Sequence, residues 1–506
     1  MRRVGLTVTA VSVLLMLLAG AAQAEGWRDL EKRVVEKDLP NGLKVIILPR
    51  PEAPVVSMVT YADVGGVDEN QNATGLAHVF EHMAFKGTTT IGTTDYAAEK
   101  KAMQKEDAAF LALREERRRR PHPDEAKLKE LEAALKAAQD EARKFVVANE
   151  IGQIIEQEGG QGLNAFTSSD QTVYLYSLPA NKLELWAALE SDRFTNPVIR
   201  EFYKEKDVIM EEKRMGESNP ISRLISDFIP VAFKAHMYRS FVIGHLSDLQ
   251  ALSRADAEAW FKKYYGARNL TVAIVGDVDP ATVLPMLEKY LGKIPSGQKP
   301  GRVITEEPPQ RAEKRIIMED PSQPVLVIGY HMPDVAHPDH PAYKAMADIL
   351  GGGRSSRLYK SLVKEKKLAL MSAAAAGLAE KYPSLFLTFA MPNKGKTNAE
   401  CEAAIYEEIE KLQQQPVTPE ELEGVKARAK SAFIDSVENN TGLALNLAKT
   451  QNLEGDWRRM FRELEAIDQV TAADIQRLAQ QLFVRSNRTV GMIENNPAAK
   501  PAGPGN

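Results

Sequence analysis

Two histidines and a glutamate that lie close together in the sequence could bind a metal ion and activate water. His78 and His82 are four residues apart, so on a helix their imidazole rings lie on one face and can reach one zinc ion. Glu81 shares that face and could take a proton from a water molecule beside the metal. The chain has only eight histidines in 506 residues. A surface helix that carries this pattern by chance is therefore the less favoured interpretation.

A catalytic zinc site needs a third protein ligand and keeps its fourth position open. The best candidates lie in a glutamate-rich stretch farther along the chain. Glu205 and Glu212 are two helical turns apart and share a helix face, whereas Glu211 points about a hundred degrees away from Glu212. A glutamate-rich helix taken alone indicates a solvated surface. Residue spacing by itself therefore leaves the third ligand open.

Six segments of the chain carry a more specific pattern, namely 39–45, 65–69, 78–88, 164–167, 205–212 and 269–277. Their types and order resemble the pitrilysin or insulinase family of zinc peptidases, which includes the mitochondrial processing peptidase. In that family the H-x-x-E-H order reverses the H-E-x-x-H of other zinc peptidases. The resemblance covers most of the chain that follows the N-terminal segment.

The resemblance implies a role for each candidate residue. His78, His82 and Glu212 would bind one zinc ion per chain, Glu81 would be the general base, and Glu205 would be a supporting residue. The resemblance also implies an edge strand that holds the substrate backbone. Its four residues are Asn164, Ala165, Phe166 and Thr167.

The function implied by the resemblance is that of a zinc metalloendopeptidase. Such an enzyme would hydrolyse peptides or unfolded protein segments inside an enclosed chamber. The alternatives are a non-catalytic subunit of a peptidase complex and a chaperone-like module that binds peptides and keeps zinc only for structure. A structural zinc site would need a fourth protein ligand, and the sequence has no evident candidate for one. The sequence does not indicate the substrate or the cleavage preference.

The resemblance also implies a dimer. Family members complete the site with an arginine and a tyrosine seven residues apart, supplied by the half that faces the zinc domain. The corresponding residues here are Val363 and Leu370, whose side chains donate no hydrogen bond. We therefore expect a zinc-free sister subunit that supplies the pair. The alternative is that Tyr359 or Lys364 substitutes for it.

An internal repeat divides the chain into two related domains. A capped helix that runs into a buried strand is predicted from Ser253 and again from Thr471. The strands begin at Asn269 and Asn487, at the same spacing in both copies. The second copy lacks the metal-binding residues. When Gly87 is aligned with Gly351, the residues opposite His78, Glu81 and His82 are Ala342, Ala345 and Met346.

The predicted fold class is α+β, with two homologous domains that each pack helices on a mostly antiparallel sheet. The first domain carries a charged helical hairpin at about 100–147, which is either a solvated decoration or a docking or gating element. Arg2, Arg3, the apolar run 8–19 and a small-residue site predict a signal peptide, cleavage after Ala24 and export to the periplasm. The predicted segments are a signal peptide (1–24), a zinc peptidase domain (25–294), a linker (295–311), a non-catalytic domain (312–497) and a disordered tail (498–506).

Composition argues against several other classes. The net charge of −4 gives no reason to expect nucleic acid as a partner. Cys401 is the single cysteine, so the chain forms no intramolecular disulfide, and its helical context predicts a packed thiol. No later stretch of 18 apolar residues occurs, so we expect no stable membrane span. His331, His337 and His340 lie among prolines in a predicted loop, where exposed or capping histidines are favoured over a second metal site.

Overall fold

The computed structural model describes residues 29–499. The predicted signal peptide and nearly all of the predicted tail lie outside these residues. Within the described chain, no helix is both long enough and apolar enough to cross a bilayer.

The first sheet contains six strands in the order β1-β2-β6-β3-β5-β4. One pair, β2 and β6, is parallel, and the other neighbours are antiparallel. Every residue of β6 is buried, as expected for a strand covered on both faces. The strands are β1 (Val35–Asp38), β2 (Lys44–Pro49), β3 (Val55–Ala62), β4 (Gln161–Thr167), β5 (Thr172–Pro179) and β6 (Leu270–Gly276).

The second sheet repeats this topology with five strands in the order β7-β11-β8-β10-β9. Its one parallel pair is β7 and β11, which corresponds to β2 and β6 of the first sheet. The predicted α+β class with two homologous, mostly antiparallel domains is therefore confirmed. The strands are β7 (Lys314–Asp320), β8 (Val325–Met332), β9 (Ala369–Ala376), β10 (Ser384–Pro392) and β11 (Arg488–Asn495). The domain boundaries given above remain predictions.

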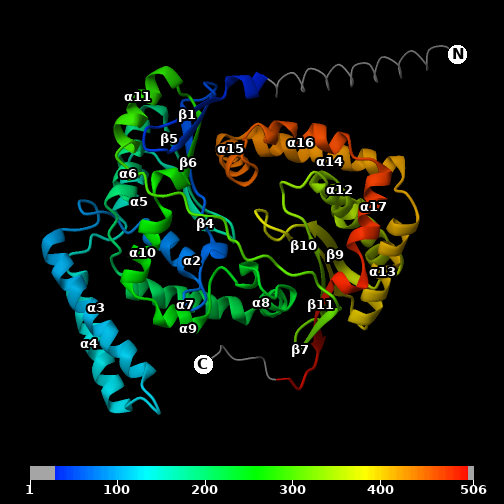
Figure 1. Cartoon of the computed structure of the whole chain (residues 1–506), viewed down its shortest axis with the longest axis horizontal. Helices are drawn as coiled ribbons and strands as arrows, with labels where there is room; N and C mark the ends of the chain where they lie inside the picture. The colour runs from blue at the N-terminus through cyan, green and yellow to red at the C-terminus, as the bar shows by residue number, and fades with distance from the viewer. Residues whose placement is uncertain (1–28, 500–506) are drawn as a thin grey trace.

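Helices cover both sheets (Figure 1). The helices before the second sheet are α2 (Leu76–Met83), α3 (Tyr96–Arg118), α4 (Glu125–Arg143), α5 (Glu150–Gln157), α6 (Leu183–Thr195), α7 (Phe202–Ser218), α8 (Pro220–Ala232), α9 (Leu246–Ala251), α10 (Arg254–Tyr264) and α11 (Pro280–Leu291). The helices that follow β8 in the chain are α12 (His340–Gly351), α13 (Asn398–Gln414), α14 (Pro419–Glu438), α15 (Asn440–Glu454), α16 (Arg459–Asp468) and α17 (Ala472–Leu482), with a π-helix at Tyr359–Glu365.

The two domains exchange a helix with each other. Helix α8 lies between β5 and β6 of the first sheet in the chain but packs on β7 and β11 of the second sheet, where Phe228 lies in a shared core with Val327 and Ile493. Helix α15 makes the reverse contact, because it packs on β3 and β6 of the first sheet. Each sheet therefore buries one face only with the help of the other domain.

The repeated helix-to-strand units have the predicted form. Ser253 caps α10 in a capping box with Asp256, and Thr471 caps α17 in the same way with Asp474. Each helix leads into a central strand, β6 or β11. The capping residues that revealed the repeat in the sequence therefore mark the same structural position twice.

The predicted hairpin consists of α3 and α4, and it projects from the body of the molecule (Figure 1, cyan). Helix α4 is almost wholly exposed, with Ala142 as its one buried residue. The start of α3 is buried, because Glu99 receives a 2.8 Å hydrogen bond from Arg200 and Asp107 receives one of 2.8 Å from Tyr203 on α7. The base of the hairpin thus supports α7.

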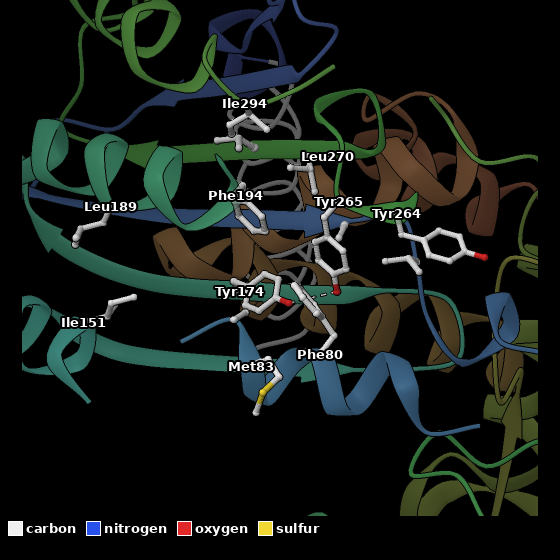
Figure 2. Packing of buried hydrophobic residues seen from close by; sticks show 14 of the residues in the cluster. Phe80, Met83, Ile151, Tyr174, Leu189, Phe194, Tyr264, Tyr265, Leu270 and Ile294 are labelled. Atoms are coloured by element: carbon white, nitrogen blue, oxygen red, sulfur yellow. Dashed lines mark hydrogen bonds between the residues drawn. The ribbon is translucent and has the colours of Figure 1, made fainter. Parts of the chain in front are cut away.

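Helix α2 is anchored in the core of the first domain by its apolar face. Figure 2 shows Phe80 of α2 pointing toward Tyr174 on β5 and Tyr265 after α10, and Met83 of the same helix belongs to the same core. The rings of Phe80 and Tyr265 have centroids 4.3 Å apart, and the hydroxyls of Tyr174 and Tyr265 are 3.3 Å apart. This packing fixes which face of α2 is left for polar side chains.

Candidate metal and active site

The face of α2 opposite the core carries the histidine motif. Leu76, Val79, Phe80 and Met83 are buried in the domain core, and His78, Glu81 and His82 lie on the other side of the helix. The rings of His78 and His82 have centroids 4.8 Å apart. The predicted helix and the predicted shared face are therefore both present.

The start of α2 is fixed by two residues. Gly75 precedes the helix with a φ of 88°, and a Cβ there would lie 2.6 Å from the carbonyl oxygen of Ile243, so glycine is required. Glu69 is buried and accepts hydrogen bonds from the backbone N–H groups of Gly75 (2.9 Å) and Ala77 (2.8 Å). These are amides that a helix leaves unpaired at its N-terminus. Burial raises the pKa of Glu69 to about 8.

Helix α7 brings Glu212 to both histidines. Its Oε2 atom lies 3.8 Å from His78 Nε2 and 3.9 Å from His82 Nε2. One ligand atom from each of the three residues lies within 4.8 Å of the others. A tetrahedral zinc with bonds of about 2.0–2.2 Å holds its ligand atoms roughly 3.3 Å apart. The ligand atoms of the two imidazoles and the carboxylate are farther apart than this. They would fit a zinc ion after the side chains move inward.

Glu205 lies behind His82, one step away from these ligand atoms. Its Oε1 is 3.2 Å from His82 Nδ1, and Lys86 Nζ donates a 2.6 Å hydrogen bond to its Oε2. Burial opposes ionisation of Glu205, but the bonds to His82 and Lys86 prevail and lower its pKa to about 2. A carboxylate on the outer nitrogen of a ligand histidine orients the ring and makes it a better donor.

The two histidines differ in their electrostatics. Burial and the neighbouring His82 lower the pKa of His78 to about 4, so His78 is neutral at physiological pH. Burial also acts to lower the pKa of His82, but Glu205 and the nearby carboxylates outweigh it and raise that pKa. His78 Nδ1 is buried without a hydrogen-bond partner in the described chain. The orientation of His78 therefore depends on packing, and that of His82 on Glu205.

Glu81 is held by the edge strand. Thr167 Oγ1, at the end of β4, donates a 2.6 Å hydrogen bond to Glu81 Oε2. Burial raises the pKa of Glu81, which makes its carboxylate more basic. Strand β4 pairs with β5 on one side and ends the sheet on the other. Its four predicted residues lie in that strand, with Asn164 exposed and Ala165, Phe166 and Thr167 half-buried.

Other predicted residues lie elsewhere. Glu211 forms an exposed ion pair with Arg214 and does not join the histidines. Cys401 is a buried thiol, as predicted, and burial raises its pKa to about 11. The prediction that His331, His337 and His340 lie together in a loop is wrong in part. His331 is on strand β8 and His340 begins helix α12, so only His337 lies between elements, and the described residues bring no metal-ligand group together there.

Sequence reasoning missed three contributors. Glu69 and Lys86 lie within segments that match the family pattern, but the pattern predicts no role for them, and Thr167 was expected to contact substrate only. Lys86 follows His82 by one helical turn, a spacing that could have suggested a shared environment. The contact from Glu69 to the start of α2 spans an irregular segment, so no periodic pattern indicates it.

Comparison with known proteins shows that the chain belongs to the M16 family of peptidases. The model described as "Insulinase (Peptidase family M16)" matches residues 44–115 and 142–241, and "Peptidase M16 inactive domain" matches 251–429. The first model omits 116–141, which lies within the hairpin. The inactive-domain match covers α12, where Ala342, Ala345 and Met346 replace the histidine motif.

Relatives and solved structures agree with this assignment. The chain is 27% identical over 478 residues to a zinc protease, PqqE, of Helicobacter pylori, covering 92% of this chain and 94% of that one. It is 23% identical over 478 residues to an uncharacterised zinc protease of Mycobacterium leprae, covering 92% of each. The crystal structure of a protease from Helicobacter pylori matches with a TM-score of 0.75 at 23% identity, covering 91% of this chain and 99% of that one. The periplasmic protease PqqL from Escherichia coli matches with a TM-score of 0.68 at 18% identity, covering 93% of this chain and 49% of that one.

Proposed function

We propose that the chain is a zinc-dependent endopeptidase that hydrolyses peptides or unfolded protein segments in an enclosed chamber. His78, His82 and Glu212 hold one zinc ion, and Glu81 is the general base. The convergence of these ligand atoms beside Glu81 is the observation that carries the proposal. The M16 membership and the zinc-protease names of the relatives support it.

The chain's own residues divide the work of hydrolysis. When bound, zinc supplies a Lewis acid that lowers the pKa of water and polarises the scissile carbonyl. Glu81 accepts the proton of the attacking water and delivers it to the leaving amine. Thr167 holds the Glu81 carboxylate in place, and burial keeps that carboxylate basic enough for the task.

Substrate binds in an extended conformation along β4. The free edge of this strand presents backbone N–H and C=O groups that can pair with another strand, so affinity comes largely from main-chain hydrogen bonds. The exposed Asn164 and half-buried Phe166 lie where substrate side chains would pass. A substrate bound in this way would lie beside Glu81, because Thr167, which contacts Glu81, ends the same strand.

Glu81→Gln separates hydrolysis from metal binding. Glutamine keeps the shape of the side chain and loses the base, so we expect about one zinc per chain and a loss of cleavage on the order of 10²–10⁴-fold. Zinc content measured by metal analysis and cleavage of an unstructured peptide check this. His78→Ala should lose both zinc and activity, whereas Glu211→Gln, on the exposed side of α7, should lose neither.

The result also separates the alternatives. A chaperone-like module with structural zinc would bind metal and peptide without cleaving the peptide, and a non-catalytic subunit would bind no zinc. Full cleavage by Glu81→Gln would refute the assignment of the base.

We further propose that the protein is exported to the periplasm and that its signal peptide is cleaved after Ala24. Arg2, Arg3 and the apolar run that follows support this, as does the structural likeness to a protease described as periplasmic. N-terminal sequencing of protein from fractionated cells should give a start at Glu25 in the periplasmic fraction. A start at Met1 in the cytosol would contradict it.

A further inference from the structure

The second domain contains a cavity at the position that corresponds to the candidate metal site of the first. The correspondence is fixed by a pair of asparagines. Asn219 separates α7 from α8 and caps α8, and Asn439 separates α14 from α15 and caps α15. Counting back the same number of residues from each asparagine places Ala432 opposite Glu212 and Val425 opposite Glu205.

These replacements surround one space. Ala345 of α12, which aligns with Glu81, lines the same cavity as Val425 and Ala432 of α14. The cavity has a volume of about 410 Å³ and opens to solvent. Three small or branched apolar side chains thus stand where the first domain has three carboxylates. The cavity therefore lies where the first domain has the carboxylates of its candidate site.

The chemistry of the walls is apolar. Phe433, Met460, Leu464 and Ile467 add larger side chains from α14 and α16. Asn446 and Thr450 of α15 supply polar groups along one wall. Space of this volume with a few polar groups is typical of a small-molecule site. A metal ion would find no ligand set here, because the described chain groups metal ligands only around His78, His82 and Glu212.

The charges at the rim cancel in pairs. Lys344 pairs with Glu463, and Arg428 donates to Asp348 with an Nε–Oδ2 distance of 2.9 Å. Each of these four charged side chains is paired, so none is left to attract an ionic ligand. The rim therefore favours a neutral ligand. All the lining residues lie on helices α12, α14, α15 and α16. An extended peptide would therefore find no free strand edge in the cavity.

We propose that this cavity is a binding site for a neutral, mostly apolar organic molecule of small size. Such a molecule displaces water from the apolar walls and hydrogen-bonds to Asn446 or Thr450. It also contacts α15, whose opposite face packs Leu443 and Leu447 on the first sheet. Binding therefore stabilises the junction between the two domains.

A fluorescence titration of the full mature protein with N-phenyl-1-naphthylamine, a neutral apolar probe, tests the proposal. Wild-type protein should show saturable binding to one site per chain. Ala432→Leu fills the cavity and should weaken binding at least tenfold. Ala427→Leu is the matched control, because Ala427 is an exposed alanine of the same helix, as Ala432 is, but does not line the cavity, and it should bind as wild type does. Glu81→Gln should also bind as wild type, since it lies in the other domain.

Circular dichroism and thermal unfolding identify variants that fail to fold. If Ala432→Leu does not fold, Ala429→Leu fills the same space from the next turn of α14 and takes its place. Probe binding should raise the melting temperatures of wild-type protein, Ala427→Leu and Glu81→Gln, but not that of the cavity-filling variant. Equal affinity in wild type and in the folded cavity-filling variant would overturn the proposal, and so would the absence of saturable binding to wild type.

Discussion

Glu205 influences the candidate metal site through a histidine. Its carboxylate contacts His82 Nδ1 on one oxygen and Lys86 on the other. Removing such an outer partner typically weakens metal affinity by about 10–100-fold. We therefore expect Glu205→Gln to bind zinc more weakly by that factor and to regain cleavage when zinc is added in excess. Zinc titration with a competing chelator checks this, with Glu211→Gln as the control. Unchanged affinity would mean that packing alone orients His82.

The same residue predicts a pH dependence of stability in the metal-free protein. Its pKa of about 2 in the folded protein lies below the ordinary glutamate value of 4.5. The stability that Glu205 contributes is therefore fully present above pH 4.5 and is lost as the pH falls toward 2. Glu205→Gln cannot lose this contribution, so its stability should decline less over that window. Urea unfolding of both proteins at several pH values measures the difference, and parallel declines would contradict the prediction.

At the scale of elements, α2 depends on a cap outside the helix. Glu69 accepts the N–H groups of Gly75 and Ala77 with its two oxygens. Loss of a helix cap costs about 0.5–2 kcal/mol, and the freed amides are buried here. We expect Glu69→Ala to lower stability by about 1–3 kcal/mol and to weaken zinc binding, because the turn that carries His78 becomes less ordered.

Chemical unfolding and zinc titration of the same samples check that prediction. Glu52→Ala is a suitable control, since Glu52 is exposed and its one ion pair, with Arg50, is 3.9 Å long. A Glu69→Ala protein with wild-type stability and zinc affinity would show that the core packing of Phe80 and Met83 is enough to hold α2.

Much of the candidate site could be predicted because its residues lie on helices with regular spacing. His78, Glu81 and His82 share one turn of α2, and Glu205 and Glu212 share one face of α7. The cap by Glu69 could not be predicted, because it depends on the path of an irregular segment. His331 was misplaced because nearby prolines indicate a loop, whereas its pairing with Leu385 in the second sheet is a tertiary contact.

The fold was predictable as a tandem repeat of α+β domains, but the exchange of helices was not. Helices α8 and α15 both bury apolar residues, among them Phe228 of α8 and Leu447 of α15. Nothing local to either helix indicates which sheet covers it, because both sheets offer an apolar face. The capping residues Ser253 and Thr471 did predict where their helices begin, because a cap is a local interaction that the sequence shows directly.

At the scale of the whole molecule, Val363 and Leu370 occupy the positions at which the family resemblance implies an arginine and a tyrosine. Val363 lies in the π-helix half-buried, and Leu370 is exposed on β9. A hydrogen-bond donor to a developing oxyanion can contribute about 10²–10³-fold in rate. On the proposal that a zinc-free sister subunit supplies the pair, the purified chain should cleave an unstructured peptide slowly and accelerate by roughly 10²-fold when that subunit is added.

Peptide cleavage measured with and without the sister subunit tests this. The acceleration should vanish when the chain carries Glu81→Gln, which shows that the catalytic zinc site belongs to this chain. Tyr359→Phe and Lys364→Ala test the alternative donors. Full activity from the chain alone, lost in either variant, would contradict the sister-subunit proposal.

The reciprocal placement of α8 and α15 has a consequence for how the chain can be divided. Two copies of one ancestral unit that trade a segment form a swapped pair, and here the segment 295–313 fuses the pair into one polypeptide. Expressed separately, either unit would expose an apolar sheet face, together with a helix whose apolar residues have lost the sheet that covers them. A chain cut within 295–313 would instead stay assembled, because α8 of the first piece still packs on the second sheet and α15 of the second piece on the first sheet. The covalent link thus sets the stoichiometry of the two units, and the packing of α8 and α15 on the opposite sheets holds the units together.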